Sequence, residues 1–181
     1  MEKVRLGIIG AGNMGSGHIG NYKKGLLPEI EITAVADRRQ ERRDWAKAEL
    51  GDAVAIFSEG SDLIASGLVD AILIAVPHYQ HPTLAIEGFQ HNLHVLCEKP
   101  ASVRYDLAQQ MADAAHETGK ILNIGVVNRF NNAVNALRDD VLAGKLGSVY
   151  HVYCSFRAHR SIPGLGGPFT TKELAGGGVL I

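Results

Sequence analysis

Short runs of apolar residues alternate along this chain with longer stretches in which apolar positions recur every three or four residues. The short runs contain little polar alternation, which is typical of strands buried on both faces of a parallel sheet. The longer stretches predict amphipathic helices. We expect strands at Val4–Ile9, Ile32–Ala36, Val54–Phe57, Ala71–Val76, His94–Cys97 and Ile121–Gly125. We expect the intervening helices at Met14–Lys24, Glu41–Leu50, Ser61–Ser66, Thr83–His91 and Val103–Thr118.

This regular alternation of strand and helix over residues 1–125 predicts an α/β domain with a doubly wound parallel sheet. The helix over Val103–Thr118 has the clearest apolar face, and Gly119 directly after it predicts a C-terminal cap. The sequence contains no solenoid-type repeat and no low-complexity segment.

The pattern changes near residue 126 and predicts the start of a second unit over residues 126–181. A helix is expected at about Ala133–Ala143, followed by a strand at Val149–Phe156 whose side chains alternate between two environments. About 55 residues cannot readily enclose a core of their own, and such a strand would expose unpaired edges. We therefore expect residues 126–181 to be partly disordered, or to pair with the same strand of another copy in a homo-oligomer.

Composition limits the function classes. The chain has 181 residues, 46% of them hydrophobic and 20% charged, with a formal net charge of −1. This balance argues against a general nucleic-acid or membrane surface, and no apolar run reaches the roughly 18 residues of a membrane span. The first strand is expected to begin directly after the N-terminus, so we expect no signal peptide. Cys97 and Cys154 lie in apolar contexts and predict two buried thiols in a reducing, cytoplasmic setting.

A glycine-rich turn, "GAGNMG", follows the first strand and opens the first helix. Gly10 permits the tight turn, Gly12 lets a pyrophosphate approach the backbone, and Gly15 lets helix and strand pack closely. Asn13 and Met14 lie at the helix start, where free N–H groups and the positive end of the helix dipole attract phosphates. The turn therefore predicts a Rossmann-type dinucleotide site.

Asp37 ends the second strand, where a carboxylate accepts hydrogen bonds from the adenosine ribose hydroxyls. The alternative role is a cap for the following helix. Asp37 should repel a 2′-phosphate and so favours NAD, whereas the guanidinium of Arg38 or Arg39 could pair with that phosphate in NADP. The cluster "DRRQERR" at residues 37–43 alternates with acids and is expected on a solvated helix start.

The fourth strand ends in "AVPHYQHP". Val76 and Pro77 are expected at the carboxyl edge of the sheet, where open α/β sheets bind ligands. His78, and less directly His81, are expected near the cofactor. No carboxylate or cysteine accompanies the two histidines with ligand spacing, so no metal site is predicted.

The fifth strand ends in "CEKP". Glu98 and Lys99 should emerge beside the nicotinamide end of the crevice. The Lys99 ammonium can hydrogen-bond a substrate hydroxyl and stabilise the alkoxide that forms as hydride leaves the carbon. Glu98 either orients the lysine or contacts the cofactor. The alternative is an exposed ion pair of little consequence. Pro100 admits a cis Lys99–Pro100 bond.

Together the segments "GAGNMG", "VAD", "AVPHYQH", "HVLCEKP", "VNRF" and "GKLGSVYHV" resemble the Gfo/Idh/MocA family of NAD(P)-dependent oxidoreductases. The resemblance implies an N-terminal Rossmann domain, a C-terminal α/β domain with a mostly antiparallel sheet, and hydride transfer at a carbinol carbon of a sugar, inositol or related polyol. It also implies that Lys99 is catalytic and that Arg129 lies near the substrate.

Two departures from the family pattern bear on function. His78 stands where relatives commonly carry asparagine. The family segment "GGG-L-x-D-x-G-x-H" supplies an active-site Asp and His, whereas "GGGVLI" stops before both. The resemblance therefore implies a dehydrogenase shortened within its second domain, with impaired turnover. The alternative is a non-catalytic dinucleotide-binding protein, or a subunit completed by another chain.

Overall fold

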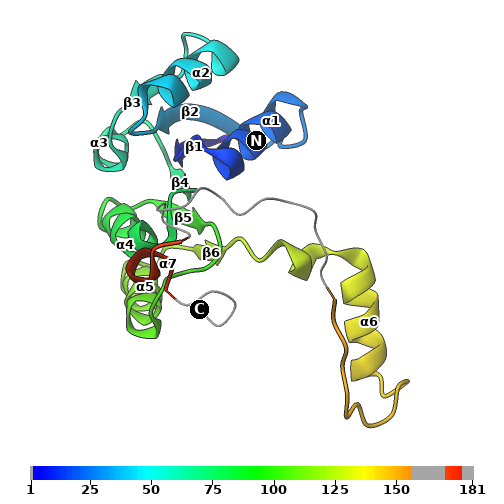
Figure 1. The fold of residues 1–181 in the computed structure, drawn as a ribbon. Helices are drawn as coiled ribbons and strands as arrows, with labels where there is room; N and C mark the ends of the chain where they lie inside the picture. The colour runs from blue at the N-terminus through cyan, green and yellow to red at the C-terminus, as the bar shows by residue number, and fades with distance from the viewer. Residues whose placement is uncertain (1, 156–169, 177–181) are drawn as a thin grey trace.

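Six parallel strands form one sheet in the order β3-β2-β1-β4-β5-β6 (Figure 1). The computed structural model describes residues 2–155 and 170–176 of the chain. Hydrogen-bonded register joins each strand to its neighbour in parallel orientation, so all carboxyl ends meet at one edge of the sheet. The strands are β1 Val4–Ile9, β2 Ile30–Ala36, β3 Ala55–Phe57, β4 Ala71–Ile74, β5 His94–Cys97 and β6 Leu122–Ile124.

Helices cover both faces of this sheet. The helices are α1 Asn13–Lys23, α2 Gln40–Leu50, α3 Gly60–Ala65, α4 His81–Gln90 and α5 Tyr105–Thr118. One apolar cluster contains Ile19 of α1 and Ala46 of α2. The other contains Leu63 of α3, Phe89 of α4 and Met111 of α5. The strand order runs from β1 through β2 to β3 on one side and through β4 and β5 to β6 on the other, so the sheet is wound in both directions from β1.

The predicted fold class is confirmed, and the elements predicted over residues 1–125 begin and end within two residues of the observed ones. β1 and β5 have the predicted bounds, whereas β4 ends two residues earlier than expected. α4 begins two residues earlier, with Pro82 in its first turn, where the missing N–H costs no helical hydrogen bond. Gly119 caps α5 in the left-handed conformation at φ +64°, as predicted.

Beyond β6 the chain leaves the sheet as a short 3-10 turn, η2 Val127–Phe130, and helix α6 Asn132–Leu142, which projects away from the domain (Figure 1). The side chain of Asn131 caps α6 by accepting from the N–H groups of Ala133 and Val134. The strand predicted from Val149 is wrong for residues 149–155, which form no strand. A strand needs a hydrogen-bonded neighbour, and none pairs with this segment among the described residues.

The end of the described chain adds a helix that the sequence did not indicate, α7 Lys172–Ala175. It packs against the 3-10 turn η1 His78–Gln80, which lies between β4 and α4. The "GGGVLI" segment lies outside the described residues beyond Gly176. The tail "TTKELA" thus returns to the carboxyl edge of the sheet.

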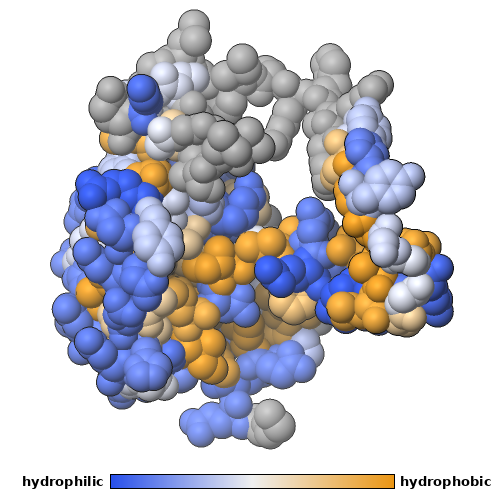
Figure 2. All heavy atoms as spheres, turned by 90° about the horizontal axis from the view of Figure 1, so that it is seen from below, coloured by the Kyte–Doolittle hydropathy of each residue, from blue (hydrophilic) through white to orange (hydrophobic). Residues whose placement is uncertain are grey.

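Apolar side chains are exposed over η2, α6 and the following segment (Figure 2). The exposed members include Phe130, Val134, Leu137, Leu142, Tyr150, Val152 and Tyr153. The prediction of two buried thiols is correct for Cys97 and wrong for Cys154, which is exposed. Within residues 2–155 and 170–176, no helix is long and apolar enough to span a bilayer.

Candidate cofactor and active site

The glycine turn after β1 brings backbone groups closer than side chains would allow. Gly10 has φ +96°, and a Cβ there would lie 2.6 Å from the carbonyl oxygen of Ala75. A Cβ on Gly15 would lie 1.9 Å from the carbonyl oxygen of Gly10. Gly12 is the N-cap of α1 and provides no side-chain hydrogen bond to the helix. The helix start therefore presents backbone N–H groups to an anion, as dinucleotide pyrophosphates require.

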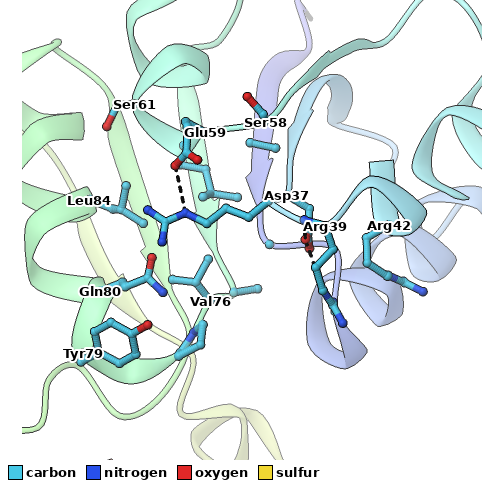
Figure 3. A pocket seen from close by; sticks show the side chains of 18 of the residues that line it. Asp37, Arg39, Arg42, Ser58, Glu59, Ser61, Val76, Tyr79, Gln80 and Leu84 are labelled. Atoms are coloured by element: carbon cyan, nitrogen blue, oxygen red, sulfur yellow. Dashed lines mark hydrogen bonds and ion pairs between the residues drawn. The ribbon is translucent and has the colours of Figure 1, made fainter. Parts of the chain in front are cut away.

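A pocket of about 640 Å³ opens beside this turn (Figure 3). It lies at the switch point of the sheet, where β1 has β2 as its neighbour on one side and β4 on the other. Such switch points bind ligands in open α/β sheets. Of the predicted cofactor residues, the pocket is lined by Gly10, Gly12, Asn13, Asp37, Arg38, Val76 and Pro77. Arg39, considered above as a partner for a 2′-phosphate, also lines it. Residues that the sequence did not indicate complete the lining, among them Arg42, Ser58, Glu59, Ser61, Tyr79 and Gln80.

The charged residues in the pocket wall are three arginines and two carboxylates. Arg38 Nε donates to Glu59 Oε2 at 2.9 Å. Arg42 Nε donates to the Ala11 carbonyl at 2.6 Å, and its guanidinium lies 4.3 Å from the Trp45 ring centroid. The prediction of a solvated helix start is therefore wrong for Arg42. The balance of one positive charge suits a phosphate-bearing ligand.

Asp37 connects the end of β2 to the glycine turn through hydrogen bonds. Its Oδ2 accepts from the Ala11 N–H at 2.8 Å, and its Oδ1 accepts from the Arg39 N–H at 2.9 Å. Figure 3 shows Asp37 and Arg39 at the same end of the pocket. A carboxylate oxygen has more than one lone-pair site, so Asp37 retains acceptor capacity for ribose hydroxyls while holding the turn.

Glu98 links the fifth strand to the helix of the glycine turn. Its side chain is buried, at 6% exposure, and its Oε1 lies 3.0 Å from His18 Nε2 of α1. Its Oε2 accepts from the Lys99 N–H at 3.3 Å. The Lys99–Pro100 peptide bond is cis, as the proline suggested, and the Lys99 side chain is exposed. Of the two roles considered for Glu98, this geometry favours orientation of the lysine backbone.

The remaining predicted residues lie around the pocket rather than in its wall. Met14 is exposed at the start of α1, and Gly15 is buried against Gly10. His81 is fully buried, with Nδ1 2.8 Å from the Pro100 carbonyl oxygen and Nε2 2.9 Å from that of Val76. Neither ring nitrogen of His81 is left for a cofactor.

His78 and Arg129 lie on the two 3-10 turns. Burial lowers the pKa of His78 below its usual value of 6.5, and the charges of His81 and Lys99 lower it further. His78 is therefore a neutral imidazole at pH 7. Arg129 is exposed on η2, and its predicted place beside a substrate stays a prediction. Among the described residues, no cluster of three His, Cys, Asp or Glu could hold a metal ion.

The two cysteines provide a simple test of this geometry. Burial, with the charge of Glu98, raises the pKa of Cys97 to about 12, so its unreactive thiol form persists at neutral pH. Cys154 is exposed. We expect a thiol reagent at pH 8 to label one cysteine rapidly in the native chain and two in denaturant, with Cys154 identified by peptide mapping. Rapid labelling of Cys97 in the native chain would contradict the burial of this residue at the end of β5.

The parallel sheet, the glycine turn and the pocket at the switch point define a dinucleotide-binding Rossmann protein. A model of the Gfo/Idh/MocA oxidoreductase family, described as having an NAD-binding Rossmann fold, matches residues 4–126. The chain belongs to this family, and the prediction of an NAD-binding domain is confirmed.

Individual relatives agree with this assignment. The rhizopine catabolism protein MocA of Rhizobium meliloti is 37% identical over 155 residues, which cover 85% of this chain and 47% of that protein. An inositol 2-dehydrogenase of Rubrobacter xylanophilus is 34% identical over 148 residues, covering 81% and 42%. The crystal structure of the WlbA dehydrogenase from Bordetella pertussis, in complex with NADH and UDP-GlcNAcA, has a TM-score of 0.76 at 31% identity, covering 82% and 45%. The chain spans about half the length of the relatives it matches.

Proposed function

We propose that this chain is the dinucleotide-binding part of an NAD-dependent dehydrogenase that oxidises a carbinol carbon of a sugar, inositol or related polyol. The observation that carries the proposal is the placement of the glycine turn and Lys99 at one edge of the sheet, joined by the hydrogen bond between His18 and Glu98. The relatives named as an inositol dehydrogenase and as a dehydrogenase holding NADH and a sugar nucleotide support the substrate class.

Different residues along that edge of the sheet would bind different parts of the cofactor and the substrate. The backbone at Gly12 and the start of α1 would hold the pyrophosphate, and the Asp37 carboxylate would accept from the adenosine ribose. Bound NAD supplies the hydride acceptor. Lys99 would donate a hydrogen bond to the substrate hydroxyl and stabilise the developing alkoxide, since a fixed cation acts most strongly where charge appears in the reaction. Glu98 would hold the Lys99 backbone while the ammonium faces the substrate.

Lys99→Ala tests the catalytic assignment. Because the Lys99 side chain is exposed, we expect its removal to leave folding intact and the NADH dissociation constant within about threefold of wild type. The rate of NAD reduction with inositols and aldoses should fall by about 100-fold or more. Lys3→Ala is the matched control, because Lys3 is exposed at the amino end of β1, on the opposite edge of the sheet. Equal rates in the Lys99→Ala variant and wild type would contradict the assignment.

A second candidate function is a dinucleotide-binding subunit without chemistry of its own, or one completed by another chain. The exposed apolar surface over η2 and α6 favours it, because such surfaces are normally covered by protein. NADH binding to the wild-type chain without oxidation of any inositol or aldose would select this candidate. Homo-oligomer formation through residues 126–181 stays a prediction that analytical ultracentrifugation would check.

A further inference from the structure

Arg38 and Glu59 form an ion pair in the wall of the dinucleotide pocket. Each lies two residues beyond the end of a strand, Arg38 after β2 and Glu59 after β3, and both line the pocket. Arg38 Nε donates to Glu59 Oε2 at 2.9 Å, the contact drawn as a dashed line at Glu59 in Figure 3. Because Arg38 directly follows Asp37, this pair belongs to the end of the pocket proposed for the adenosine ribose.

Local contacts favour the pairing of these two side chains. Arg43 holds the backbone that carries Arg38, since its Nη1 donates to the carbonyl oxygens of Asp37 and Arg38, each at 2.8 Å. Glu59 is the N-cap residue of α3, but its side chain accepts no hydrogen bond from the described residues of that helix. The Glu59 carboxylate therefore binds the guanidinium and does not cap the helix.

The Arg38–Glu59 pair is too exposed to be important for folding. The Arg38 side chain is 68% exposed and the Glu59 side chain 49%. Ion pairs at such exposure contribute little to stability, because water and salt screen the two charges. The main consequence of the pair is therefore the charge that the pocket presents to a ligand.

That charge matters at the 2′ position of the adenosine ribose, where NAD has a hydroxyl and NADP a phosphate. A phosphate monoester carries a charge of about −1.5 to −2 at pH 7. In Rossmann proteins an arginine near the acidic residue after the second strand accommodates this phosphate. Arg38 has the right place for the role, but Arg38 and Glu59 together carry no net charge, and Asp37 adds a negative one.

The second arginine that could receive a 2′-phosphate is also balanced by carboxylates. Arg39 Nε lies 3.5 Å from Asp37 Oδ1 and 3.7 Å from Glu41 Oε1. Glu41, however, lies outside the pocket lining given by the described residues, whereas Glu59 is part of it. Glu59 is therefore the carboxylate whose removal would leave an unbalanced guanidinium inside the pocket.

We infer that Glu59 is a specificity-determining residue, which selects NAD over NADP by holding Arg38 in a neutral pair. An unpaired guanidinium at Arg38 would offer a 2′-phosphate a matching set of donors and a full positive charge. With Glu59 present, a 2′-phosphate has to compete with the carboxylate for that guanidinium. The inference rests on the dinucleotide binding in the proposed function, and it does not depend on hydride transfer.

Glu59→Gln tests this role, because the variant keeps the size of the side chain and removes its charge. We expect the dissociation constant of NADPH, divided by that of NADH, to fall about 10-fold or more from its wild-type value, the effect of one charge-assisted hydrogen bond. Fluorescence titration of the 181-residue chain with both reduced dinucleotides, at one ionic strength, measures this ratio. An unchanged urea midpoint checks that the variant is folded.

Glu41→Gln is the matched control, because it removes the same charge beside the neighbouring arginine from outside the pocket lining. Its ratio should stay within about twofold of wild type, since Arg39 keeps Asp37 as a partner. A second comparison uses the Arg38→Gln background. If Glu59 acts through Arg38, then adding Glu59→Gln there should change the ratio by less than about twofold.

An unchanged ratio in folded Glu59→Gln that binds NADH would overturn the inference. An equal fall in Glu41→Gln would overturn it too, because net charge alone would then explain the effect. A full 10-fold fall in the Arg38→Gln background would overturn the role of the pair, since Glu59 would then act without Arg38. A wild-type chain that bound neither dinucleotide would contradict both proposals, whereas one that bound NADH but oxidised no polyol would contradict the proposed function alone.

Discussion

Gly15→Ala is expected to abolish detectable NADH binding and to lower the free energy of unfolding by about 3 kcal/mol or more. The added Cβ would lie 1.9 Å from the Gly10 carbonyl oxygen, which is far inside van der Waals contact. The atom it meets is backbone, so no side-chain rotation relieves the overlap. Either α1 moves away from β1 or the glycine turn changes conformation, and both displace the helix start that faces the pyrophosphate.

Gly17→Ala is the control for this substitution, because Gly17 lies on the same helix and its added Cβ would meet nothing within 4 Å. We expect unchanged NADH affinity and a gain in stability of about 0.5–1 kcal/mol from the better helix propensity of alanine. Urea denaturation measures the stability of both variants, and quenching or enhancement of NADH fluorescence measures binding. Wild-type affinity in Gly15→Ala would show that close packing at the turn is not required for the cofactor.

Local patterns along the chain were sufficient to predict the sheet and the edge that carries the site. Buried runs without polar alternation require a covered parallel sheet, and parallel strands place all their carboxyl ends together. Residues that directly follow strands could therefore be placed without further information. Gly10, Asp37, Val76 and Glu98 all lie at that edge for this reason.

Contacts made across the fold could not be predicted in the same way. His18 and Glu98 are 80 positions apart, and nothing near either residue indicates the other. Arg42 lies three positions after Arg39, the N-cap of α2, so the two share one side of the first helical turn. That spacing was the available signal that Arg42 faces the pocket, but the alternating charges of the cluster suggested solvent instead.

The strand predicted from Val149 shows why alternation alone is insufficient. An alternation of side-chain types shows only that a segment could place one face toward an apolar layer and the other toward a different environment. A strand forms only when its backbone groups also find hydrogen-bond partners on another strand. No described strand lies beside residues 149–155, and the sheet ends at β6. Cys154, which lies on this segment, is exposed and not buried as its sequence context suggested.

His18→Ala is expected to lower the free energy of unfolding by about 2 kcal/mol. Removing the hydrogen-bond partner of a buried polar group costs about 1–3 kcal/mol, and more where that group is charged, because the group stays buried and unsatisfied. The His18 ring retains 28% exposure, so water can replace part of the lost contact and the expected cost is smaller. His116→Ala on the exposed side of α5 is the control and should stay within about 0.5 kcal/mol of wild type.

A double-mutant cycle with Glu98→Gln separates the pair from the loss of either side chain alone. A neutral amide needs no imidazole to remain buried, so His18→Ala should cost at least about 1 kcal/mol less in the Glu98→Gln background than in wild type. Additive effects, measured by urea denaturation at pH 7, would mean that His18 stabilises α1 independently of Glu98. Coupled effects would mean that the Glu98 carboxylate, beside Lys99, directly stabilises α1, the helix of the glycine turn. A substitution near Lys99 would then also alter the position of the glycine turn, and the reverse.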